Sequence, residues 1–125
     1  MSASRTSMDQ LATAVEAARD KHGENFVALD VSGLFPLSDI FFLVSGRSER
    51  NVQAIADEVE DKMIAAGTKR IRREGRAAGR WILLDFGDII VHIFHQEERA
   101  YYDLERLWKD CPAISLDVPE ASVDA

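Results

Sequence analysis

Apolar residues near the start of the chain recur at the spacing of an α-helix. Steps of three and four residues return to one side of a helix, and the narrow stripe they form here consists of Leu11, Ala14, Val15 and Ala18. Ser7, with Gln10 three residues later, has the pattern of a capping box. Gly23 is placed to end the helix. The pattern therefore predicts a first helix that begins at Ser7 and ends near Gly23.

A wider apolar stripe in the middle of the chain predicts a second helix. Its members are Val52, Ile55, Ala56, Val59, Met63 and Ala66. Charged residues occupy positions 57, 58 and 60–62, on the opposite side, so the helix has one buried face. Ser48 is a good N-cap and Gly67 supplies the stop.

Short apolar runs predict five β-strands, at residues 26–31, 39–45, 69–73, 81–85 and 88–95. Residues 39–45 are almost continuously apolar, as expected for a strand covered on both faces. The last two runs are also apolar at both alternating sets of positions, although a half-buried hairpin needs only one. Phe86 and Gly87 lie between them, and we expect a two-residue connection in which the glycine supplies the unusual backbone angle.

The end of the chain predicts one more helix, from Glu97 to Trp108. The element order is then α-β-β-α-β-β-β-α. No linker is long enough to divide domains, so residues 1–112 form a single domain. Helices on both sides of a mixed five-stranded sheet predict an α/β fold with three layers. Residues 113–125 are acidic and short of large side chains, and we expect them to form a disordered tail.

Charge is distributed unevenly along the chain. The formal net charge of −7 opposes bulk attraction to nucleic acid or to an anionic membrane. Residues 69–80 nevertheless hold six basic residues and one acid, so this loop carries +5 and the rest of the chain −12. This distribution suits a basic protein partner that lies near phosphates. A solvated and mobile loop explains the same composition, and that alternative stays open.

Membrane insertion and secretion are not indicated by the sequence. No apolar run approaches the roughly 20 residues that span a bilayer, and the first residues lack the apolar core of a signal peptide. Cys111 is the single cysteine, which excludes an intramolecular disulfide and a cysteine-based zinc site. These features predict a cytoplasmic protein.

Asp85 and Asp88 invite a catalytic interpretation. Paired carboxylates near a strand-to-helix turn such as Ser45-Gly46 are typical of nucleotidyltransferases, which hold catalytic magnesium in that way. In nucleotidyltransferases the two carboxylates are separated by a single residue, so both project from the same face of one strand. Asp85 and Asp88 are three residues apart across a tight turn, where Asp is favoured because it accepts turn amides. A nucleotide-handling enzyme therefore remains only the alternative hypothesis.

Other reactive side chains do not form a recognisable catalytic or metal site. His92 and His95 lie three residues apart in a predicted strand, so their imidazoles diverge and cannot share a metal. A hydrogen-bonded histidine in an apolar sheet is the better interpretation of His92. Cys111 has no nearby motif histidine, so we do not expect a catalytic thiol. The sequence predicts no metal and no cofactor.

Aromatic residues on the last hairpin favour a binding surface. Phe86 occupies the hairpin tip, where a large aromatic side chain is usually exposed. An exposed aromatic beside Trp81 and Arg80 has the composition of an interface hot spot. For Trp81 taken alone, complete burial in the core explains the sequence equally well.

These segments together resemble the ribosomal silencing factors of bacteria and organelles, the RsfS/Iojap family. The resemblance rests on Gly-Arg-Trp followed after four residues by Phe-Gly-Asp, then a histidine and a Tyr-x-Leu-x-x-Leu-Trp ending, within residues 72–108. Upstream, residues 39–46 and 48–57 match as well, so the resemblance runs from about Leu11 to Pro112. It also implies that the α/β fold is distantly nucleotidyltransferase-like.

The resemblance implies a function without catalysis. A ribosomal silencing factor binds the large ribosomal subunit through the universal fourteenth protein of that subunit, uL-fourteen. The docked factor occupies the surface where the small subunit would join, so translation is repressed by steric exclusion. Family members also tend to self-associate, so a homodimer is a further expectation.

Site residues follow from the family's motif. The docking positions correspond here to Trp81 and Phe86, flanked by Arg80, Asp85 and Gly87. We add one expectation from charge alone, which is not a property of the family. We expect ribosomal RNA phosphates or acidic groups to lie at the rim of the interface, in contact with Arg72, Arg73 and Arg76.

Overall fold

The computed structural model describes residues 3–33, 38–70, 72–98 and 111–116. Within them the order of helices and strands matches the prediction through the fifth strand. The elements are α1 (Arg5–Asp20), β1 (Glu24–Asp30), β2 (Ile40–Gly46), α2 (Glu49–Ala65), β3 (Arg72–Glu74), β4 (Trp81–Asp85) and β5 (Ile89–His95). Residues 96–98 are helical, and the rest of the helix predicted up to Trp108 lies outside the described residues.

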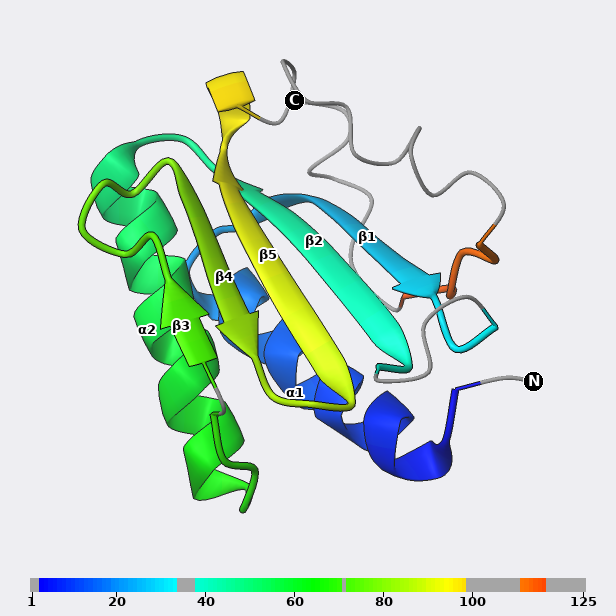
Figure 1. Ribbon diagram of the computed structural model, residues 1–125. Helices are drawn as coiled ribbons and strands as arrows, with labels where there is room; N and C mark the ends of the chain where they lie inside the picture. Colours follow the sequence, from blue (N-terminus) through cyan, green and yellow to red (C-terminus); the bar gives the residue numbers. More distant parts are fainter. Residues whose placement is uncertain (1–2, 34–37, 71, 99–110, 117–125) are drawn as a thin grey trace.

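The five strands form one mixed sheet in the order β1-β2-β5-β4-β3 (Figure 1). The central pair, β2 and β5, is parallel, and every other neighbouring pair is antiparallel. All seven residues of β2 are buried. The continuous apolar run therefore marks a strand covered on both faces, as the sequence predicted.

Both described long helices cover the same face of the sheet (Figure 1). Their apolar stripes pack on alternate strand residues such as Phe42, Ile82 and Val91, which form the main core. The opposite face carries a second, smaller cluster that includes Phe41, Phe94 and Cys111. Two layers are thus present in the described residues, and the rest of the helix expected to complete the third layer, beyond residue 98, lies outside them.

The start of α1 differs from the prediction. The N-cap is Ser4, whose hydroxyl oxygen accepts a hydrogen bond from the amide of Ser7 at 3.1 Å. Ser7 is instead buried inside the helix and donates its hydroxyl proton to Asp39 at 2.8 Å. That partner is 32 residues away in sequence, so the capping-box pattern at Ser7 could not reveal it. The N-cap of α2 is Ser48, as predicted.

The segment after Pro112 is not a disordered tail at its start. The carbonyl oxygen of Pro112 accepts from the amide of Asp30, and the amide of Ile114 donates to Ala28, both at 2.8 Å. These bonds place residues 112–114 along the free edge of β1. The expectation of disorder is therefore wrong for residues 113–116, while residues 117–125 lie outside the described part.

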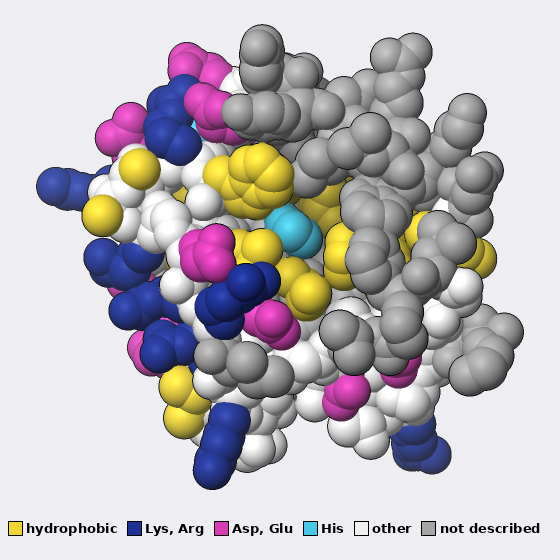
Figure 2. Space-filling view, viewed as in Figure 1, with side chains coloured by type: hydrophobic (Ala, Val, Ile, Leu, Met, Phe, Trp, Pro, Cys, Tyr) yellow, Lys and Arg dark blue, Asp and Glu magenta, His cyan; other side chains and the backbone are white. Residues whose placement is uncertain are grey.

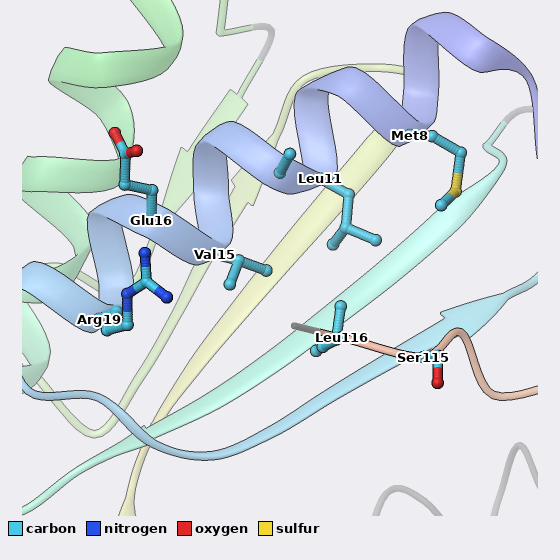
Figure 3. Close-up of a pocket in the computed structure, with 8 residues that line it drawn as sticks. Met8, Leu11, Val15, Glu16, Arg19, Ser115 and Leu116 are labelled. Carbon is cyan, nitrogen blue, oxygen red and sulfur yellow. The ribbon is translucent and has the colours of Figure 1, made fainter. Parts of the chain in front are cut away.

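A groove runs between α1 and this carboxy-terminal segment (Figure 3). Leu116 faces Leu11 and Val15 across it, and its volume is about 210 Å³. The segment thus ties the edge strand to the helical layer, which removes one exposed sheet edge. No described helix is long and apolar enough to cross a membrane.

Candidate protein interface

Five side chains project together from β3 and β4 on the face opposite the helices. Residues directly opposite each other in an antiparallel pair share a face of the sheet, and the register pairs Arg72 with Asp85 and Glu74 with Leu83. Trp81 lies on the same face because it is two residues from Leu83. We call this surface the Trp81 face; it consists of Arg72, Glu74, Trp81, Leu83 and Asp85. Figure 2 shows apolar side chains gathered on this side of the sheet, around a histidine.

The Trp81 side chain is fixed by contacts on β5 but is not fully buried in the core. Its indole N–H donates a hydrogen bond to Nδ1 of His92 at 3.3 Å, and its ring lies 4.9 Å from that of Phe94. The residue remains half-buried. Neither full burial nor free exposure describes it, so both interpretations of the sequence were incomplete. A rigid, partly exposed indole is the kind of side chain that anchors interfaces.

The neutral imidazole of His92 accepts the hydrogen bond that positions this indole. The side chain is 7% exposed, and burial lowers the pKa of His92 from 6.5 to about 4. Its Nδ1 therefore accepts from the indole, which leaves the proton on Nε2. Nε2 finds no acceptor among the described residues. The prediction of a hydrogen-bonded histidine in an apolar sheet is confirmed, and its partner is the site tryptophan.

A hollow of about 300 Å³ opens beside Trp81. Its walls are Glu74, Gly75, Trp81 and Leu83. Gly75 has a φ of +84°, and a Cβ there would come within 2.1 Å of the carbonyl oxygen of Trp81. Only glycine fits so close to the β4 backbone. Alternation along β4 alone places Leu83 on the face of Trp81, whereas only the register of β3 against β4 shows that Glu74 shares this face.

Phe86 is not exposed, which corrects the expectation for the hairpin tip. It is 5% exposed and packs in the main core, on the face opposite Trp81. Its amide donates to the carbonyl of Ile89 at 3.0 Å, so the ladder extends one residue further than predicted. The two-residue connection is therefore Gly87-Asp88, with φ of +87° at Gly87. Phe86 supports the turn from the core side.

Asp85 and Asp88 have structural roles in this turn. Asp85 accepts a hydrogen bond from the amide of Gly87 at 2.8 Å, as expected for aspartate in a turn. The backbone carbonyl of Asp88 accepts from the amides of Asp39 and Ile40, which fixes the start of β2. Among the described residues, no three His, Cys, Asp or Glu side chains are grouped to hold a metal ion.

The basic loop is paired with acids of the same chain. Arg73 lies 3.0 Å from Glu60, and Arg76 makes two hydrogen bonds to Asp57, at 2.9 and 2.6 Å. Both partners belong to α2, on the helical side of the sheet. Of the three arginines expected at the rim, Arg72 alone belongs to the Trp81 face. Contact of these arginines with phosphates stays a prediction.

Arg80 closes the end of the sheet next to Trp81. Its guanidinium binds Glu98 at 2.8 Å, Glu97 at 3.0 Å and Glu49 at 3.4 Å. Glu98, and after it Glu97, raise the pKa of Arg80. Arg80 therefore connects β4 to the start of α2 and to residues 96–98. It positions the elements around Trp81 rather than offering a free charge.

Comparison with known proteins gives one consistent family. The family model described as "Ribosomal silencing factor during starvation" matches residues 4–125. The chain is 43% identical to ribosomal silencing factor RsfS of Halalkalibacterium halodurans, over 90% of this chain and 96% of that protein. It is also 43% identical to RsfS of Bacillus subtilis, over 86% of this chain and 91% of that one. A crystal structure of a Chromobacterium violaceum protein superposes with a TM-score of 0.80 at 35% identity, covering 90% of this chain and 92% of that chain.

Proposed function

The chain belongs to the ribosomal silencing factor family, and on this premise we propose that it docks on the large ribosomal subunit through ribosomal protein uL-fourteen. The family is regulatory, and the membership of this chain in it supports a role in ribosome silencing and translational control. In the proposed mechanism, the bound protein occupies the surface on which the small subunit would dock. The two subunits cannot join because the bound protein sterically excludes the small subunit, so translation is repressed without a chemical step.

The geometry of Trp81 is the observation that supports this proposal best. The indole is fixed by His92 and by Phe94, so little conformational entropy is lost when a partner covers it. Leu83 extends the apolar surface, and charged groups of Arg72, Glu74 and Asp85 surround it. An aromatic anchor within a polar rim is the usual anatomy of a protein interface.

The other motif residues act through the scaffold in this proposal. Phe86 holds the β4–β5 turn from the main core, and Gly87 supplies its positive φ. Asp85 caps that turn while lying on the Trp81 face. Arg80 ties the end of β4 to three carboxylates. Docking therefore relies on Trp81 directly and on these four residues for its shape.

A subunit-joining experiment tests the proposal. Purified large and small subunits are mixed with the protein at fixed magnesium and separated by sedimentation. We expect the protein to migrate with the large subunit and joined ribosomes to decrease. Trp81→Ala should weaken binding by about 2 kcal/mol, which is roughly 30-fold.

A matched control separates docking from general loss of apolar surface. Ile64 is 55% exposed on α2, away from the Trp81 face, so Ile64→Ala should bind and block joining like the wild type. Both variants must remain folded at the temperature of the binding assay, which thermal unfolding checks. A wild-type protein that neither binds the large subunit nor hinders joining would contradict the proposal. Binding to isolated uL-fourteen, measured separately, tests the identity of the partner.

A further inference from the structure

The hollow beside Trp81 combines an apolar floor with one acidic wall. Trp81 and Leu83 supply the floor from β4, and Glu74 stands opposite Leu83 on β3. The Glu74 side chain is 58% exposed, so its carboxylate is open to an incoming group. The hollow has a volume of about 300 Å³, which is room for one long side chain. A ligand that fits must be apolar along its length and positive at its tip.

The protein already shows a cation beside this carboxylate. The guanidinium of Arg72 lies 3.2 Å from Glu74 and 3.9 Å from Asp85, and the Arg72 side chain is 55% exposed. Ion pairs as exposed as this one contribute little to stability and exchange readily. Arg72 therefore marks where a cation sits on this face, and Asp85 can retain Arg72 when another cation takes Glu74.

We infer that the hollow takes a lysine or arginine side chain of the ribosomal partner, with its stem against Trp81 and Leu83 and its cationic head on Glu74. The inference rests on the proposed function and names the chemistry of the partner. Long basic side chains cover apolar surface with their methylene stems. A cation close to the face of an indole gains further attraction from the ring. Phosphate is disfavoured at this position, because Glu74 and Asp85 outnumber Arg72.

Charge complementarity over the whole molecule supports the same partner chemistry. Outside residues 69–80 the chain carries −12, so a basic protein surface is attracted from a distance. The basic residues of the loop do not reverse this on the Trp81 face, since Arg73 and Arg76 are paired with Glu60 and Asp57 on the helical side. Glu74 then selects a basic side chain at short range.

The test compares three variants for binding to purified large subunits. Glu74→Gln keeps the shape of the side chain and removes its charge, and we expect about tenfold weaker binding. Glu74→Lys should weaken binding further, because it places like charges together. Arg72→Gln removes the cation that competes for Glu74, so binding should be tighter than that of the wild type. Asp61 lies at an exposed position of α2, so Asp61→Asn is the matched control for loss of one negative charge. This control should bind like the wild type.

Each outcome separates this inference from the proposed function. If the wild type does not bind the large subunit, the proposed function fails and the inference fails with it. If the wild type binds and Glu74→Gln binds equally well, the inference alone is overturned. The same holds if Arg72→Gln weakens binding as strongly as Glu74→Gln, because Arg72 would then be the contacting charge. If Glu74→Gln changes only self-association of the free protein, the occupant is a second copy of this chain, which also overturns the inference.

Discussion

The indole nitrogen of Trp81 donates a hydrogen bond to Nδ1 of His92 across 3.3 Å, between neighbouring strands β4 and β5. The arrangement couples the most prominent residue of the proposed interface to a buried titratable group. Only the neutral imidazole can accept this bond, because both nitrogens of a protonated imidazole are donors. The hydrogen bond that positions the Trp81 indole therefore depends on the protonation state of His92.

Stability should fall as the pH drops from about 6.5 to about 4. Burial lowers the pKa of His92 to about 4 in the folded protein, whereas the unfolded chain takes up this proton near 6.5. The unfolded state then binds more protons within this window, so acid favours unfolding, by at most roughly 3 kcal/mol. Urea denaturation at several pH values measures the effect. In His92→Gln this contribution should be absent, and an identical pH dependence in both proteins would contradict the assignment.

Gly75→Ala should destabilise the protein by roughly 2–4 kcal/mol. The new Cβ would lie 2.1 Å from the carbonyl oxygen of Trp81, and φ of +84° is unfavourable for alanine. Gly67→Ala is the matched control, since its φ is +92° but nothing lies within 4 Å of the added Cβ. We expect the control to lose only about 1 kcal/mol in urea denaturation. Equal losses would show that backbone strain, and not the close approach to β4, decides the effect.

The sheet and the two described long helices were accessible from sequence because their signals are local. Periodicity alone revealed the stripe of α2, and the continuous apolar run identified β2 as a strand covered on both faces. The Ser48 cap is also local, since its hydroxyl accepts from Asn51 three residues later. Such features depend on neighbours along the chain, so they need no knowledge of the fold.

Features that depend on distant contacts were missed or misread. Ser7 resembled a cap in the local sequence, whereas its true partner, Asp39, lies just before β2 and 32 residues away. Phe86 was expected at an exposed tip because one additional ladder bond to Ile89 was not predictable from turn composition. Glu74 joined the candidate site only when the register of β3 was known. The site could be located to β4 from sequence, but its neighbours required the sheet pairing.

Glu60→Gln should cost roughly 1–3 kcal/mol of stability. Glu60 is 8% exposed, and it pairs with both Arg70 and Arg73, so its removal leaves two guanidinium groups without their shared carboxylate. Asp57→Asn is the control, because the Asp57–Arg76 pair is about two-fifths exposed on both sides and should contribute less than about 1 kcal/mol. Thermal unfolding at two salt concentrations measures both. A larger effect for Asp57→Asn than for Glu60→Gln would contradict this ranking.

Removal of the segment that covers β1 should destabilise the protein and promote self-association. A chain ending at Cys111 loses the hydrogen bonds from Asp30 to Pro112 and from Ile114 to Ala28, together with the packing of Leu116 on the core. We expect a loss of about 2 kcal/mol or more, and the uncovered edge of β1 offers free backbone groups to a second molecule. A chain ending at Leu116 keeps all these contacts and should remain close to the full-length protein. Thermal unfolding and size-exclusion chromatography over a range of concentrations distinguish the two, and indistinguishable truncations would show that residues 112–116 do not protect this edge.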